Sequence, residues 1–141
     1  MKKNLVVAEW RRADESLRAA GLLAEQGYHA DAVSRAYYAA LHGAKAALFV
    51  EGVTAESHAG VRRMFALHLI RTGEIESEWS AHLSEGLDDR LAADYDAELS
   101  FSKEEALQEC RRSRDFLDRV RKHLLKKGFS DKELQISGRQ G

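Results

Sequence analysis

Helical periodicity without a single proline is the feature that most constrains this chain. None of its 141 residues is proline, so no position forces a kink or a stop inside a helix. Glycines separate the periodic segments instead, and a helix-like run precedes each of Gly27, Gly52, Gly73 and Gly128. Glycine readily adopts the left-handed conformation that often follows the last turn of a helix. The pattern therefore predicts helices joined by short connections.

Apolar residues at intervals of three and four predict five helices, over residues 4–26, 29–51, 57–71, 75–95 and 102–127. The most regular stripe belongs to the second segment and consists of Val33, Ala36, Tyr37, Ala40, Leu41, Ala44 and Leu48. Ser102 and Glu105 have the capping-box spacing that opens a helix. We expect an all-α, up-and-down bundle of four to five helices in residues 1–127. Residues 128–141 are expected to form a short polar tail that frays.

The same spacing predicts which faces are buried. In the first helix the expected apolar face carries Leu5, Ala8, Leu17, Ala20 and Ala24. In the fourth, Leu83, Leu87 and Leu91 form one ridge. Cys110 falls on the apolar face of the last helix, where a small core residue is a better interpretation than a nucleophile.

The charges nearly cancel but are unevenly distributed. The formal net charge is −1, which argues against a dedicated, evenly basic nucleic-acid binder. Residues 74–109 are strongly acidic and residues 111–127 strongly basic. Two interpretations stay open: antiparallel helices that pair acid with base, and a basic strip that meets phosphate or an acidic partner.

The cysteine content and the hydropathy point to the cytoplasm. Cys110 is the only cysteine, so no intramolecular disulfide can form. The apolar run at residues 5–8 is too short for a signal sequence, and no run is long enough to span a membrane. We therefore expect a cytoplasmic protein without a membrane segment.

The second helix carries an unusual polar row. Arg35, Tyr38, His42 and Lys45 follow one another at spacings of three, four and three. A guanidinium, a phenol, an imidazole and an amine in one row can bind phosphate and move protons. The alternative is structural: Tyr38 and His42 pack against another helix or a second copy, and Arg35 pairs with a carboxylate.

Three other sets of residues are weaker candidates. Arg90 and Asp94 are four residues apart, so they can pair on a helix surface. Ser57 is a candidate N-cap, which would place His58 beside a possible anion site at a helix N-terminus. One helical face carries Glu78, His82, Glu85 and Asp89, but no matching ligands occur on other segments. We expect neither a metal nor a cofactor.

Three segments together resemble the HEPN domain superfamily, and within it the UPF0332 group. They are residues 34–45 (SRAYYAALHGAK), residues 57–61 (SHAGV) and residues 90–95 (RLAADY), in the order and spacing of that family. The capping segment at residues 102–106 and the closing basic helix agree as well. The resemblance covers about residues 4–125.

This resemblance implies a helical bundle that forms a homodimer and pairs with a minimal nucleotidyltransferase, often as a toxin–antitoxin system. Many members are metal-independent RNases whose site is an arginine followed, after four to six residues, by a histidine. Here Arg90 is followed by Asp94 and Tyr95, with no histidine through Ser100. A carboxylate seldom donates a proton at neutral pH unless its pKa is well raised.

Two functions of different class follow from these residues. The missing histidine favours a binding module, catalytically silent or weak, that works with a nucleotidyltransferase or with nucleic acid; its binding residues would be Arg35, Tyr38, Lys45 and His58. The alternative is an RNase toxin in which Arg90 acts with a non-standard acid–base group drawn from Asp94, Tyr95 and His42. A minor third hypothesis is a nucleotide-binding module that holds phosphates with Arg35, Lys45 and Arg90.

Overall fold

All regular secondary structure is helical in the part of the chain that the computed structural model describes, residues 2–98 and 100–135, with the side chains of residues 87–89 and 92 left outside that description. No strand occurs within those residues. The elements are α1 (Lys3–Glu25), α2 (His29–Val50), α3 (His58–Phe65), the π-helical turn η1 (Ala66–Ile70), α4 (Glu78–Tyr95), α5 (Lys103–Lys126) and α6 (Asp131–Leu134). The expectation of an all-α bundle is confirmed.

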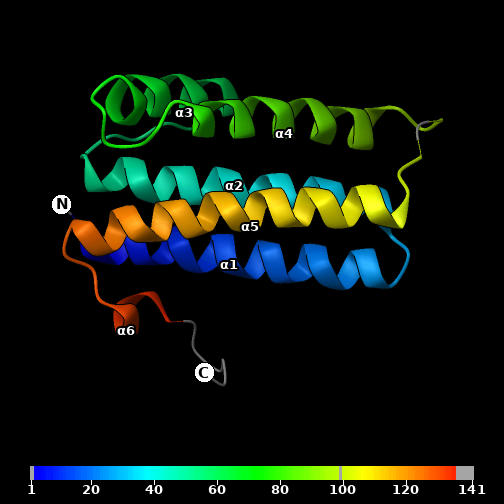
Figure 1. The fold of residues 1–141 in the computed structure, drawn as a ribbon, viewed down its shortest axis with the longest axis horizontal. Helices are drawn as coiled ribbons and strands as arrows, with labels where there is room; N and C mark the ends of the chain where they lie inside the picture. Colours follow the sequence, from blue (N-terminus) through cyan, green and yellow to red (C-terminus); the bar gives the residue numbers. More distant parts are fainter. Residues whose placement is uncertain (1, 99, 136–141) are drawn as a thin grey trace.

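Helix α2 lies at the centre of the bundle. It contacts α1 and α5 on one side and α3 and α4 on the other, and Figure 1 shows the long helices running side by side. Because neighbours cover it almost all round, α2 buries mainly small residues, among them Ala36, Ala40 and Ala44. Gly43 permits the closest approach: a Cβ added there would lie 2.4 Å from Cδ2 of Leu117 on α5.

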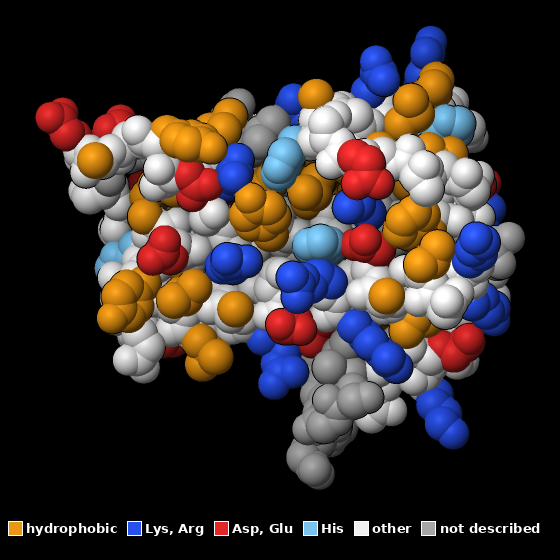
Figure 2. All heavy atoms as spheres, turned by 180° about the vertical axis from the view of Figure 1, so that it is seen from behind, with side chains coloured by type: hydrophobic (Ala, Val, Ile, Leu, Met, Phe, Trp, Pro, Cys, Tyr) orange, Lys and Arg blue, Asp and Glu red, His pale blue; other side chains and the backbone are white. Residues whose placement is uncertain are grey.

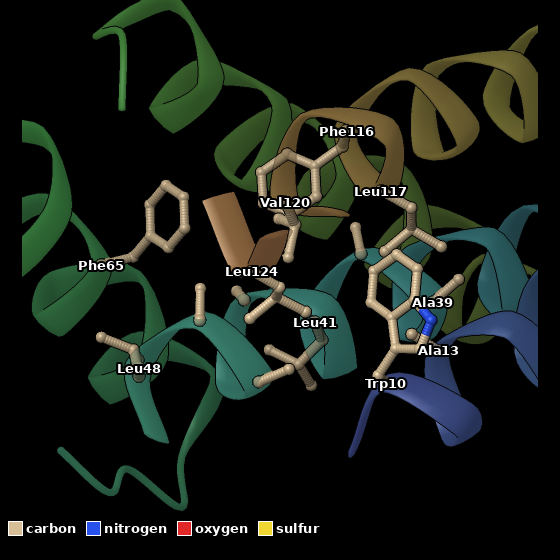
Figure 3. Close-up of a cluster of buried hydrophobic side chains, with 14 of the residues drawn as sticks. Trp10, Ala13, Ala39, Leu41, Leu48, Phe65, Phe116, Leu117, Val120 and Leu124 are labelled. Atoms are coloured by element: carbon tan, nitrogen blue, oxygen red, sulfur yellow. The ribbon is translucent and has the colours of Figure 1, made fainter. Parts of the chain in front are cut away.

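A single core joins the layers. Figure 3 shows Leu48 of α2, Phe65 of α3 and Phe116 and Leu124 of α5 pointing toward one another, and all four are at most 1% exposed. The Phe65 and Phe116 ring centroids are 5.6 Å apart, a separation at which aromatic pairs attract one another beyond simple area burial. These contacts fix α3, and thereby its N-terminus, against α2 and α5.

The helix ends follow the local sequence signals. Gly27, Gly52, Gly73 and Gly128 all have positive φ, between 74° and 104°, the left-handed conformation that costs glycine little. Ser102 accepts a hydrogen bond from the Glu105 backbone, and Glu105 bonds back to Ser102, which completes the capping box. The glycine stops and the capped start of α5 are therefore confirmed.

The structure corrects the expectation about the C-terminal tail. Phe129 is 3% and Leu134 is 4% exposed, and α6 carries a capping box of its own. The indole Nε1 of Trp10 donates a 3.0 Å hydrogen bond to the carbonyl oxygen of Leu134. Fraying is thus wrong for residues 129–134, because two apolar side chains in the tail find a place against α1; residues 136–141 lie outside the described residues.

The buried face of α1 is also different from the predicted one near its start. Leu5 is 41% exposed and Ala8 is exposed too, whereas Val6 and Trp10 are buried. The spacing of three and four fits both sets, and the large indole decides between them because it buries more apolar surface. In the second half of α1 the prediction is confirmed at Ala20 and Ala24.

Acid and base pair between the α4 region and α5. Arg112 pairs with Glu85, Arg119 Nε lies 2.7 Å from Glu76 Oε1, and Lys127 Nζ lies 3.3 Å from Glu74 Oε1. Much of the basic stretch therefore faces acidic neighbours, and Figure 2 shows both signs interspersed on the face it presents. None of the described helices is long and apolar enough to cross a membrane.

Candidate functional site

An arginine–tyrosine hydrogen bond between α4 and α2 forms the centre of the candidate site. Arg90 Nη2 donates to the Tyr38 hydroxyl oxygen at 2.7 Å, and the Arg90 side chain is only 13% exposed. Gly86, one turn earlier in α4, allows the two helices to approach. A Cβ added to Gly86 would lie 3.2 Å from Cδ1 of Tyr37, tighter than ordinary van der Waals contact.

Arg90 also lies beside one carboxylate and a second aromatic ring. Asp94 Oδ2 lies 2.9 Å from Arg90 Nε, one helical turn away. The guanidinium carbon is 5.2 Å from the ring centre of Tyr38 and 6.0 Å from that of Tyr95, within the range of cation–π attraction. Tyr95 is 75% exposed. Arg90 is therefore held in place on the protein side, while an accessible aromatic ring extends beyond it.

A shallow depression lies beside this pair. It has a volume of about 420 Å³, and its lining consists of Leu23, Asp31, Ser34, Arg35, Tyr38 and Asp94. The Arg35 guanidinium stands 5.6 Å from the Tyr38 ring centre, so two guanidinium groups lie within the range of cation–π attraction to Tyr38. Cation, ring and hydroxyl are the groups that bind a phosphate and stack on a base.

His58 approaches the same two tyrosines from the N-terminus of α3. Its Nδ1 lies 2.9 Å from the Tyr37 hydroxyl oxygen, and its ring centre is 5.9 Å from that of Tyr38, edge to face. Ser57 holds the start of α3 by accepting a 2.9 Å hydrogen bond from the backbone N–H of Gly60, which confirms the predicted N-cap. Desolvation, followed by the charges of Arg90 and nearby cations, lowers the pKa of His58.

His42 and Lys45 belong to a different cluster, centred on Glu9 of α1. Nδ1 of His42 lies 2.7 Å from Glu9 Oε2, and Nζ of Lys45 lies 3.8 Å from Glu9 Oε1. Burial acts to raise the pKa of Glu9, but the hydrogen bond with His42 and the Lys45 charge outweigh it and lower that pKa. Within the described residues, no hydrogen bond, ion pair or ring contact joins His42 to Arg90.

The polar row on α2 is thus divided between two clusters. One cluster forms around the Arg90–Tyr38 pair and contains Arg35, His58, Asp94 and Tyr95. Sequence reasoning missed Tyr37, which it placed in the apolar stripe. A phenol in an otherwise aliphatic stripe is itself a signal, since a buried tyrosine hydroxyl usually finds a hydrogen-bond partner.

The acidic face of α4 forms no metal centre among the residues whose side chains are described. The His82 ring lies 4.6 Å from that of Trp79, centre to centre, and Glu85 pairs with Arg112. The fourth member of the predicted set, Asp89, has its side chain outside the description.

Comparison with known proteins places these residues in a family context. A family model described as HEPN domain matches residues 7–123. One relative from Methanocaldococcus jannaschii, named "Putative toxin", is 34% identical over 84% of this chain and 80% of its own length, and a second toxin-named protein of the same organism is 38% identical over 79% and 83%. A UPF0332 protein of Thermotoga maritima is 30% identical over 86% of this chain and 92% of its own length.

Proposed function

This chain belongs to the HEPN domain family, in its UPF0332 branch, and we propose that it is the toxin-type component of a toxin–antitoxin pair that binds RNA at the Arg90 site. The proposal makes it a binding module first, with a minimal nucleotidyltransferase as its partner. The toxin assignment is supported by the names of the two archaeal relatives, and the partner by the family resemblance.

The observation that carries the RNA proposal is the combination of a positioned arginine with an accessible ring. Arg90 is fixed by Tyr38 and Asp94, so its guanidinium loses little freedom when it meets a phosphate. Tyr95 is 75% exposed beside it, and unstacked RNA bases bind to such rings. Arg35 adds a second cation at the neighbouring depression.

The chemistry of Arg90's own helix favours binding over cleavage. Asp94 is paired with the guanidinium, and a carboxylate in that setting accepts protons rather than donating them. His42, the proton-transfer group of the alternative RNase hypothesis, is engaged with Glu9. Its contacts offer no support for a role beside Arg90.

RNA binding is tested with a labelled single-stranded oligonucleotide of mixed sequence by fluorescence anisotropy. Arg90→Gln and Tyr95→Ala should each weaken binding by about tenfold or more, since a stacked base alone contributes about 1–3 kcal/mol. Arg114→Gln on α5 is the matched control, because Arg114 is exposed and belongs to another surface. An equal loss of RNA binding in all three variants would indicate non-specific attraction and would contradict the proposal.

The partner and the oligomeric state have separate tests. We expect a homodimer, and sedimentation at micromolar concentration that gives only monomer would contradict it. A tagged copy co-expressed with a minimal nucleotidyltransferase from the same genome should purify as a complex. A complex that forms equally well with an unrelated nucleotidyltransferase would remove the argument for a dedicated pair.

A further inference from the structure

A groove between α1 and α5 is separate from the Arg90 site. The two helices lie side by side and run in opposite directions (Figure 1). Residues from 14–25 of α1 and from 107–114 of α5 line the groove, which has a volume of about 730 Å³. The depression beside Tyr38 has about 420 Å³. The groove is therefore large enough to hold several side chains of a ligand.

The floor of the groove is apolar and partly open. Leu17 and Leu107 are half-buried, and Leu22 is 68% exposed, although it is a large aliphatic residue. Gly21 follows Leu17 by one helical turn, and a Cβ added to it would meet nothing within 4 Å. Open space above a glycine, bordered by exposed leucine, is typical of a surface that another protein covers.

The edges of the groove carry cations from both helices. Arg18 belongs to α1, and Arg111 and Arg114 belong to α5. All three are exposed. Arg111 pairs with Glu104, whereas Arg18 and Arg114 make no ion pair in the part of the chain that the structure describes. Two unpaired guanidinium groups on facing helices favour an occupant that carries carboxylates.

The lining favours a protein over a nucleic acid. None of the described residues that line the groove is aromatic, whereas single-stranded RNA depends on stacking against rings. Asp14 and Glu25 also line the groove, and their carboxylates would repel a continuous phosphate backbone. An apolar floor with a few cations at its edges instead suits the apolar face of an acidic peptide.

The dimensions of the groove fit a short helix. Residues 14–25 of α1 extend over about 17 Å, at about 1.5 Å per residue, which is the length of three helical turns. An amphipathic helix places apolar side chains at intervals of three and four along one face, and such a face binds in a groove between two helices.

We propose that the groove between α1 and α5 binds an acidic amphipathic helix of a partner protein. The apolar side chains of that helix cover Leu22 and fill the space above Gly21, and its carboxylates pair with Arg18 and Arg114. This second binding surface does not depend on RNA binding at the Arg90 site, because the two surfaces share no residue.

The test measures binding of two synthetic peptides by fluorescence anisotropy. The acidic peptide has about fifteen residues, with leucine at every third or fourth position and glutamate on both sides of that stripe. The second peptide has lysine in place of every glutamate. The acidic peptide should bind saturably and at least about tenfold more tightly than the lysine peptide, and its binding should weaken as salt is added.

Gly21→Gln blocks the groove without disturbing the core. The new side chain enters open space, and glutamine favours a helix more than glycine does, so circular dichroism and urea denaturation should show a folded protein. Binding of the acidic peptide should weaken by at least about tenfold. Ala8→Gln introduces the same side chain at an exposed position of α1 outside the groove and should bind the peptide like the parent protein.

A pair of charge reversals tests the two unpaired cations. Arg18→Glu together with Arg114→Glu replaces attraction by repulsion and should weaken binding of the acidic peptide by about tenfold or more. Arg63→Glu together with Arg71→Glu makes the same change in net charge at two exposed residues outside the groove. This second pair should change binding by less than about threefold.

The outcomes separate a partner helix from the other possible occupants. Binding of the acidic peptide that is lost in Gly21→Gln and in the groove charge reversals, and kept in both controls, supports the proposal. Equal binding of the two peptides, no binding by folded protein, or binding that survives in Gly21→Gln overturns it.

A second copy of the chain and RNA have their own signatures. Self-association in sedimentation that is lost in Gly21→Gln and kept in Ala8→Gln would assign the groove to a second copy and overturn the proposal. RNA binding that is lost in the groove charge reversals and kept in the Arg63 and Arg71 pair would assign the groove to nucleic acid, with the same consequence. A failure of RNA binding at Arg90 is measured with RNA alone and leaves the peptide result standing.

Discussion

Replacing Gly43 by alanine should destabilise the bundle, although the same change elsewhere should stabilise it. Gly43 lies in the middle of α2 where that helix meets α5. A Cβ there would lie 2.4 Å from Cδ2 of Leu117 and 3.8 Å from Cε2 of Phe116. Gly21, in α1, is the matched control, because a Cβ added there meets nothing within 4 Å.

Both substitutions reduce the backbone entropy of the unfolded chain, but only Gly43→Ala also overpacks the core. Exchanging glycine for alanine inside a helix gains about 0.5–1 kcal/mol through backbone entropy, so Gly21→Ala should stabilise by that amount. At Gly43 the same gain is opposed by overpacking, which costs about 1–3 kcal/mol in a well-packed core. Leu117 is 4% exposed and has little room to rotate away. Gly43→Ala should therefore be less stable than the parent by about 1 kcal/mol.

Urea denaturation followed by circular dichroism at 222 nm measures both changes. All variants are compared at one protein concentration, because association would shift the apparent stability. A double variant, Gly43→Ala with Leu117→Ala, should show a favourable coupling, since the shortened side chain removes the clash. The packing argument is refuted if Gly43→Ala is as stabilising as Gly21→Ala.

Three further predictions concern a titration, a cap and the tail. Desolvation lowers the pKa of His123, so its proton binds more readily to the unfolded chain. The stability that buried, neutral His123 contributes should be fully present above pH 6.5, the ordinary pKa of a histidine. Below that pH the free energy of unfolding should fall by up to about 1.4 kcal/mol per pH unit. The same dependence on pH in His123→Gln would contradict this. Ser102→Ala breaks the capping box and should cost about 1 kcal/mol in urea denaturation, whereas no loss would mean that the cap is redundant. Leu134→Ala should lower the free energy of unfolding by about 2–4 kcal/mol in urea denaturation, whereas a frayed tail would leave it nearly unchanged.

Local signals in the sequence determined the helices themselves. Apolar spacing, the glycine stops and the capping box at Ser102 act within a few residues, through backbone hydrogen bonds between near neighbours. That is why the bounds of α2 and α5 agree closely with prediction. The extent of the third helix was also anticipated, although its last turn is π-helical, a detail that the spacing alone does not encode.

Only the tertiary structure decided which side chains meet. The sequence placed Arg35, Tyr38, His42 and Lys45 in one row, but α1 supplies Glu9 to one part of it and α4 supplies Arg90 to another. Packing against a neighbour is a property of two surfaces, and no pattern within one helix specifies it.

The histidine that contacts Tyr37 and Tyr38 illustrates the same limit. The partners of the site are 52 residues apart for Tyr38 and Arg90, and 21 apart for Tyr37 and His58. No histidine follows Arg90 through Ser100, and the imidazole near Tyr38 comes instead from α3, which packs on α2. The sequence by itself determined the helices and the family, whereas the meeting of their polar faces depends on long-range burial of the core that holds α3 and α4 in place.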